Sequence, residues 1–163
     1  MALSVTVGIN SYVTMEEADA YIGMSIYGAD WVIAEPDGKV RALVTAARIM
    51  ERIPYVGRKA YWNQAMAFPR IVEEQVHDDY LDPITVHQSV KDAQCEEALA
   101  RLRHGDDIRL SLLELGMSSL TIDQANESYK DTAGVGFLSQ AAKELMRRWT
   151  AYAIDVANVA GRE

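Results

Sequence analysis

The chain has 163 residues, of which 49% are hydrophobic and 25% are charged, a composition that predicts one globular domain with a single core. Its formal net charge of −8 at pH 7 argues against a protein whose whole task is to bind phosphate backbones, because that binding rests on lysine and arginine. No apolar run approaches the roughly 20 residues that span a bilayer, no signal peptide is evident, and the single Cys95 has no partner for an internal disulfide, so we expect a reducing cytoplasmic setting.

The first part of the chain predicts an extended arm followed by a short helix. Residues 3–7 alternate apolar and polar side chains, as a short strand or an extended arm does. Thr14 and Glu17 have the spacing of a capping box, in which each side chain accepts the other residue's backbone N–H. We therefore expect a helix over residues 15–24, and its buried face carries Ala18, Tyr21 and Ile22.

Two longer helices are predicted in the middle of the chain. The first covers residues 39–53, between Asp37, which would cap its start, and Pro54, which ends it. Its apolar residues at helical spacing are Val40, Leu43, Val44, Ala47, Met50 and Ile53. The second covers about residues 84–103, and its buried side carries Val86, Val90, Ala93, Ala98 and Leu102.

An irregular acidic stretch precedes that last helix. Residues 71–83 predict an exposed loop whose candidate contacts with other subunits or with the tail side are Glu73, Glu74, Asp78, Asp79 and Asp82. These carboxylates could also gather a hard cation, but the stretch lacks the glycine and the terminal glutamate of a calcium loop. We therefore favour a solvated loop.

The chain closes with a hairpin and a long helix. Residues 118–129 alternate loosely and predict a strand or an extended hairpin, and residues 132–136 form a flexible link. Apolar residues then recur in alternating steps of four and three: Leu138, Ala142, Leu145, Trp149, Tyr152, Val156 and Val159. This seam either closes the core of its own chain or packs on a neighbouring subunit or partner.

These elements predict a mainly α fold: a small helical bundle with a short β-hairpin or extended arm and a long C-terminal helix. We expect a single domain over residues 1–163, with a helical core in residues 1–136 and a docking helix and tail in residues 137–163. For partner binding we single out Leu138, Leu145, Trp149, Tyr152, Val156 and Val159.

No set of residues predicts catalysis, a metal or a cofactor. His77, His87 and His104 share no ligand spacing, and one cysteine cannot complete a zinc site. No serine lies in a nucleophile elbow. The glycines at 134 and 136 are too short a motif for a dinucleotide site and predict a hinge at the start of a helix.

The aromatic and basic run over residues 55–70 is the best candidate for nucleic-acid contact. Its aromatic rings could stack on bases while cations meet phosphates, which makes the candidate contacts Arg58, Lys59, Tyr61 and Arg70. In the alternative interpretation, Tyr61, Trp62 and Phe68 fix the turn onto the core and the cations stay outside. We favour this alternative, because a small domain needs the area that large aromatic side chains bury.

Several motifs together resemble a family of tailed-bacteriophage proteins, the head–tail connector or adaptor (head-completion) proteins, often labelled as resembling a primosomal single-stranded-DNA-binding protein. The resemblance covers residues 1–104 best. The motifs that carry it are Asn10-Ser11-Tyr12-Val13, Glu17-Ala18-Asp19-Ala20-Tyr21, Trp31, Gln64-Ala65-Met66-Ala67-Phe68-Pro69-Arg70, Asp82-Pro83-Ile84 and Val90-Lys91-x-Ala93-x-x-Glu96-x-Ala98-Leu99.

The resemblance implies a virion subunit without catalytic activity. It implies a homo-oligomeric ring, twelve-fold in related connectors, that docks below the portal protein, extends the DNA channel and carries a neck or tail-completion protein. Double-stranded DNA would pass through the lumen without sequence-specific binding, the motif residues would be scaffold, and the terminal helix would dock on the portal. The competing hypothesis is a single-stranded-DNA-binding protein of phage replication, which the net charge of −8 disfavours.

Overall fold

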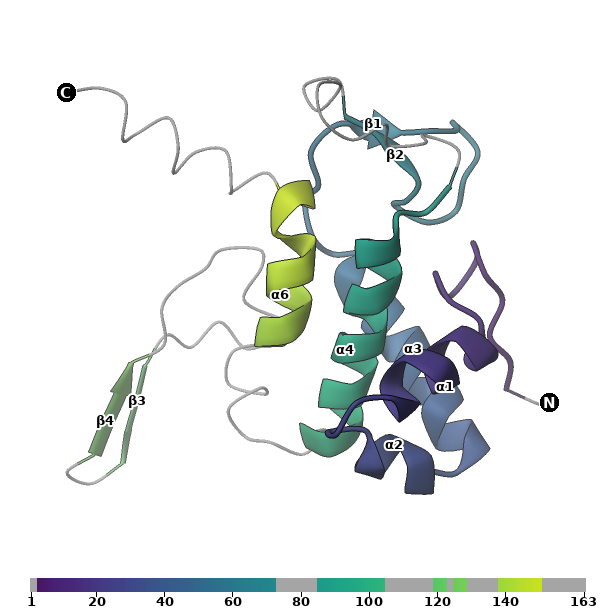
Figure 1. Ribbon diagram of the computed structural model, residues 1–163. Helices are drawn as coiled ribbons and strands as arrows, with labels where there is room; N and C mark the ends of the chain where they lie inside the picture. Colours follow the sequence, from purple (N-terminus) through teal and green to yellow (C-terminus); the bar gives the residue numbers. More distant parts are fainter. Residues whose placement is uncertain (1–2, 73–84, 105–118, 123–124, 129–137, 151–163) are drawn as a thin grey trace, which may run out of the picture.

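The computed structural model describes residues 3–72, 85–104, 119–122, 125–128 and 138–150. In these residues the fold is mainly α with short antiparallel strand pairs, as the sequence predicted (Figure 1). The helices are α1 (Met15–Gly23), α2 (Ala29–Ile33), α3 (Pro36–Met50), α4 (Gln88–His104) and α6 (Gln140–Met146). The strands are β1 (Arg58–Lys59), β2 (Arg70–Ile71), β3 (Ser119–Ile122) and β4 (Ala125–Ser128).

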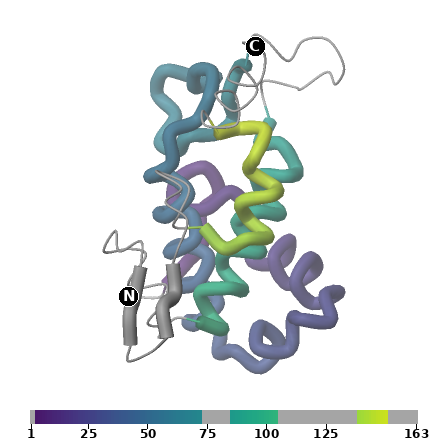
Figure 2. The backbone as a smooth tube through the Cα atoms, turned by 90° about the vertical axis from the view of Figure 1, so that its left-hand side faces the viewer, coloured from purple at the N-terminus to yellow at the C-terminus, as the bar shows by residue number. Residues whose placement is uncertain are grey.

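Helix α4 is the centre of the bundle. It packs most extensively against α3 and α6, and it also contacts α1 and α2 (Figures 1 and 2). The bundle therefore depends on one helix that contacts four others, and the buried residues of α4 decide how the remainder is arranged.

None of the helices in the described part of the chain is long and apolar enough to cross a bilayer.

The capping box predicted at the start of α1 is confirmed. The Thr14 side chain accepts the Glu17 N–H at 3.1 Å, and the Glu17 carboxylate accepts the Thr14 N–H at 2.8 Å. These bonds satisfy two of the backbone donors that a helix start leaves without a partner. Ala18 and Ile22 are buried as predicted, and the helix ends at Gly23.

Helix α3 begins three residues earlier than predicted. Pro36 occupies its first turn and Glu35 the capping position, so Asp37 lies inside the helix instead of capping it. Proline suits this position because its backbone angle is already helical and its missing N–H would have no partner there. The predicted apolar residues Val40 and Leu43 are buried.

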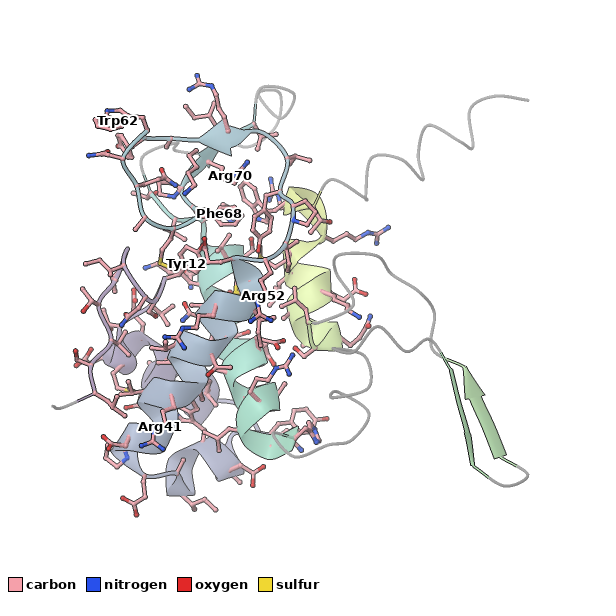
Figure 3. All side chains as sticks on the ribbon, turned by 180° about the vertical axis from the view of Figure 1, so that it is seen from behind. Tyr12, Arg41, Arg52, Trp62, Phe68 and Arg70 are labelled. Atoms are coloured by element: carbon pink, nitrogen blue, oxygen red, sulfur yellow. The ribbon has the colours of Figure 1, made fainter. Side chains whose placement is uncertain are left out.

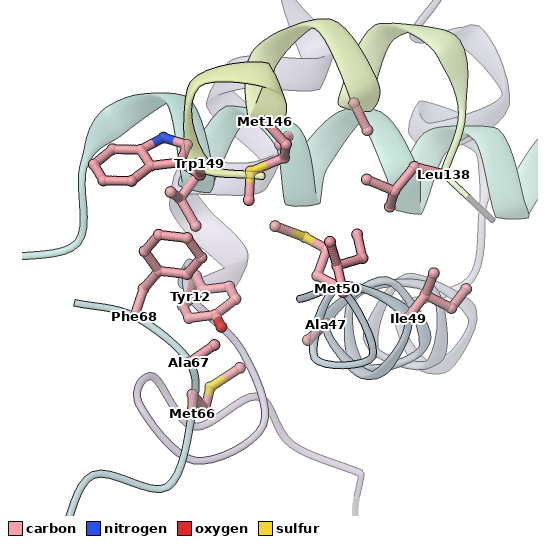
Figure 4. Packing of buried hydrophobic residues seen from close by; sticks show 14 residues of the cluster. Tyr12, Ala47, Ile49, Met50, Met66, Ala67, Phe68, Leu138, Met146 and Trp149 are labelled. Atoms are coloured by element: carbon pink, nitrogen blue, oxygen red, sulfur yellow. The ribbon is translucent and has the colours of Figure 1, made fainter. Parts of the chain in front are cut away.

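The buried side chains form two clusters along α3 and α4. One lies at the start of α3 and contains Trp31, Leu43, Cys95 and residues from α1. The other lies at the end of α3, and Figure 4 shows its residues converging from α3, α6 and the turn at Phe68. In that second cluster the Phe68 ring packs edge-on against Tyr12, Tyr55 and Trp149.

The last helix is shorter than the sequence predicted. Helix α6 ends at Met146, a 3₁₀ turn follows over Arg147–Trp149, and Thr150 is extended. The chain leaves the helix here because its backbone pairs with another segment: the Val56 N–H donates to the Trp149 carbonyl at 2.9 Å, and Thr150 bridges to Tyr55. Residues 151–163 lie outside the described residues.

The remaining predicted elements have mixed outcomes. Strands β3 and β4 form the hairpin predicted over residues 118–129. The arm at residues 3–7 makes only an isolated bridge, from Val7 to Ser11. The acidic loop falls in residues 73–84, which lie outside the described part of the chain, so its candidate contacts Glu73, Glu74, Asp78, Asp79 and Asp82 are not placed.

Candidate interaction surfaces

The first motif of the resemblance is anchored inside the bundle by Gln94 on α4. This side chain is fully buried, and its amide oxygen accepts the Tyr12 N–H at 2.7 Å. Its amide nitrogen donates to the Ser11 hydroxyl at 2.8 Å and to the Leu43 carbonyl at 2.9 Å. Gln94 thus joins α3, α4 and the N-terminal segment, and the sequence analysis missed this role.

Glu51 connects the motif that contains Tyr12 to the motif over residues 64–70. Its carboxylate accepts a hydrogen bond from the Tyr12 hydroxyl and another, at 3.0 Å, from the Ala67 N–H. Burial, together with the adjacent Glu51 charge, raises the pKa of the Tyr12 phenol well above its ordinary value, so Tyr12 stays a neutral donor. The peptide bond that follows Phe68 is cis. Both motifs therefore serve the packing of the domain.

Arg70 has a structural part in this arrangement. Its guanidinium donates to the carbonyls of Tyr55, Val56, Gly57 and Ala67, with distances from 2.5 to 3.3 Å. Partial burial lowers the pKa of Arg70. Figure 3 shows Arg70 beside Phe68 inside the loop that begins after α3. Backbone carbonyls of the protein therefore accept the Arg70 hydrogen bonds that the nucleic-acid hypothesis had assigned to phosphates.

The aromatic–basic loop, defined as residues 58–65, has an exposed tip. Phe68 is buried as we expected, but 95% of Trp62 and 44% of Tyr61 are exposed. The prediction that Tyr61 and Trp62 fix the turn onto the core is therefore wrong, because Met66, Ala67 and Phe68 already fill that part of the core. Arg58 and Lys59 are exposed at the base of the same loop.

A second exposed apolar surface lies around α2, and the sequence analysis did not identify it. Five apolar side chains there each expose between 62% and 87% of their surface: Met24, Ile26, Tyr27, Val32 and Ile33. The signal was present, because Met24, Ile26 and Tyr27 lie close together beside glycines, outside any predicted long helix, and α2 buries only Trp31. Exposed apolar patches of this kind mark binding surfaces.

The predicted docking seam lies mostly inside the core of its own chain. Leu138, Ala142 and Trp149 are buried, and Leu145 packs partly against the same cluster. The Trp149 indole donates to the Ser89 hydroxyl at 3.0 Å. Of the two interpretations of the seam, the described residues support closure of the core. Tyr152, Val156 and Val159 lie outside the described residues.

A half-open pocket of about 500 Å³ lies between the N-terminal arm, α1 and α3. Its apolar lining comes from Leu3, Val5, Val7, Met15, Pro36 and Val40. Its polar lining includes Glu16, and Asp19 paired with Lys39 at 2.8 Å. The volume is within the range of small-molecule sites, and it would also accept a large side chain from another protein.

The comparison with known families decides the family of the chain. Residues 2–156 match a family described as "Putative DnaT-like ssDNA binding protein". The chain belongs to this family. No curated protein and no solved structure matches it. The match agrees with the label that the sequence resemblance carried.

Proposed function

We propose that this chain is a structural subunit of a tailed-phage virion, a head–tail adaptor that forms a ring below the portal and extends the DNA channel. It would have no catalytic activity, and double-stranded DNA would pass through the ring without sequence-specific contact. One observation carries the proposal: the motif residues build the scaffold, while exposed apolar side chains lie at separate surfaces, which include the aromatic–basic loop, the patch around α2 and the N-terminal arm.

Two separate surfaces are what a ring requires. A subunit in a closed ring touches one neighbour through one face and the other neighbour through a different face. The net charge of −8 also suits the wall of a channel through which a polyanion must slide. Within the part of the chain that the structure describes, no group of three histidine, cysteine or acidic side chains is placed to hold a metal ion.

The direct test is electron microscopy of necks from virions of the phage that encodes this chain. The proposal expects a ring of this polypeptide between the portal and the next neck component. It also expects that particles made without the chain contain packaged DNA but no attached tail. Necks that lack the polypeptide would refute the proposal.

The packing of α6 changes which truncation can test portal docking. Removing residues 138–159 would take Leu138, Met146 and Trp149 out of the core and unfold the domain. Removing residues 151–163 deletes none of the residues that the structure describes. If those residues dock on the portal, the shortened chain should keep its helical circular dichroism spectrum and lose portal binding. Normal binding by the shortened chain would place the portal contact elsewhere.

A second candidate function is single-stranded-DNA binding, which the family description and the exposed tip of the aromatic–basic loop favour. Trp62 and Tyr61 could stack on bases while Lys59 meets phosphates. Arg70 would contribute only by shaping the loop, because its donors are bonded to carbonyls.

Tryptophan fluorescence distinguishes this candidate from the adaptor. Oligothymidine should quench Trp62, with an affinity that falls steeply as salt rises and falls again in the Lys59→Ala variant. The same titration on Trp62→Ala is the control, because Trp31 and Trp149 are buried. Fluorescence that does not respond to oligonucleotide at low salt would remove this candidate.

A further inference from the structure

The charges of this acidic protein are distributed unevenly along the chain. Residues 14–38 contain six carboxylates and no lysine or arginine: Glu16, Glu17, Asp19, Asp30, Glu35 and Asp37. Residues 54–72 contain three cations and no carboxylate: Arg58, Lys59 and Arg70. The first segment contains α1, α2 and the start of α3, and the second contains the aromatic–basic loop and the strands β1 and β2.

These two segments lie at opposite ends of α3. The pocket is lined by Pro36, Lys39 and Val40 at the start of that helix, whereas the aromatic–basic loop follows its end. Figure 3 shows Arg41 and Trp62 at opposite ends of the molecule. A helix of 15 residues is about 22 Å long. Trp62 therefore cannot enter the pocket of its own chain.

We propose that the aromatic–basic loop of one copy docks in the half-open pocket of a second copy, with Trp62 in the apolar interior and Lys59 facing the acidic rim. This inference rests on the proposed adaptor function, for which it would supply the contact between subunits. The contact joins two different surfaces, so repeating it generates a ring if the rotation closes.

The donor side of the contact is shaped for insertion. The Trp62 side chain projects from the tip of the loop, and the loop is held in place by the Gln64 amide, which donates to the carbonyls of Met66 and Pro69 at 2.8 and 3.0 Å. Tryptophan is one of the residue types enriched at interface hot spots, which lie in well-packed pockets. Because the loop is already ordered, docking costs little conformational entropy.

The acceptor side offers matching chemistry. The larger part of the pocket lining is apolar, and its volume of about 500 Å³ exceeds what an indole ring needs. Lys39 and Asp19 in the lining pair with each other at 2.8 Å, so the acidic character of the rim comes from the exposed Glu16, with Glu35 and Asp37 on either side of the lining residue Pro36. The Lys59 ammonium donates to the carbonyls of Gln64 and Ala65 at 3.3 and 3.4 Å, and a third proton remains for a carboxylate.

Trp62 itself provides the assay. The chain has three tryptophans, and Trp31 and Trp149 expose only 1% and 2% of their surface, so acrylamide should quench Trp62 selectively. The purified full-length chain is measured over a concentration series, with sedimentation velocity in parallel. We expect the quenchable fraction to fall as a species larger than the monomer appears. Trp62→Ala should weaken association by about 30-fold or more.

A charge exchange tests the pairing of the two surfaces. Lys59→Glu and Glu16→Lys should each weaken association by about 10-fold, and the chain that carries both substitutions should recover to within about 3-fold of the original. Arg52→Glu and Glu144→Lys make the same changes of charge at exposed positions away from both surfaces, and they should have no effect. A double variant that is no better than the single variants would overturn the assignment.

Cross-linking shows whether the contact joins two copies. A carbodiimide links a lysine to a carboxylate in direct contact, and a mixture of isotopically light and heavy chains distinguishes links between copies from links within one. The expected product joins Lys59 of one copy to Glu16, Glu35 or Asp37 of another. Unchanged quenching at the highest concentration, without this product, would refute the contact.

The outcome of these association experiments is independent of the test of the adaptor function. Virions with a ring of this chain whose Trp62 side chains lie outside the pocket would refute the contact and keep the adaptor function. Association through Trp62 by a chain that is missing from the neck would do the reverse.

Discussion

Replacing Gln94 by leucine should destabilise the domain strongly although the volume of the side chain hardly changes. The substitution removes three hydrogen bonds of 2.7 to 2.9 Å. Ser11 keeps its bond to the Val13 carbonyl at 2.7 Å, but the buried Tyr12 N–H loses its acceptor. An orphaned buried donor costs about 1–3 kcal/mol. The leucine side chain offsets little of this cost, so we expect the free energy of unfolding to fall by about 2 kcal/mol.

The measurement is urea unfolding followed by circular dichroism at 222 nm. With a slope of about 2 kcal/mol per molar urea, the midpoint should fall by about 1 M. Gln88→Leu is the matched control, because Gln88 is an exposed glutamine on the same helix whose side chain donates to Asp92, at 2.8 Å. Its effect should stay within about 0.5 kcal/mol. If Gln94→Leu is as mild as the control, Gln94 does not hold the bundle together.

Three further predictions concern other parts of the molecule. Arg70→Lys should lower the free energy of unfolding, measured by thermal denaturation, by about 1–3 kcal/mol, because a single ammonium cannot reach the four carbonyls that the guanidinium bonds. An unchanged melting temperature would contradict this. Burial raises the pKa of Cys95 to about 12, so a thiol reagent at neutral pH should react with it only after denaturant is added. A hydrogen bond from Lys91 lowers the pKa of Glu17. The stabilisation that this pair gives to the folded protein should therefore be present above about pH 4.5 and lost at lower pH. In the Lys91→Ala variant, the free energy of unfolding should depend less on pH in this range.

Local chemistry made several elements predictable. The capping box at Thr14 and the spacing of apolar residues in α3 and α4 are patterns within a few residues, and the structure contains them close to the expected positions. The start of α3 was misplaced because Asp37 was taken as the cap, whereas Pro36 already occupies the first turn of the helix. The hairpin of β3 and β4 was also predictable from alternation.

The candidate surfaces were only partly predictable. The sequence placed aromatic and basic residues together in residues 55–70, but it could not say which of them faces solvent. Phe68 is buried and Trp62 is exposed because only one of the two meets the rings of Tyr12, Tyr55 and Trp149. Tyr12 and Trp149 come from distant parts of the chain, so no local pattern contains the answer.

By itself the sequence determined the family, the mainly α class and the chain segments that become helices, because these depend on motifs and on spacing within a few residues. Only the tertiary structure decided the rest. It ended α6 at Met146 by pairing Trp149 with Val56, and it made Gln94 and Glu51 the links between motifs. Burial and backbone pairing join residues that are far apart in the chain, and those contacts exist only once the helices have packed.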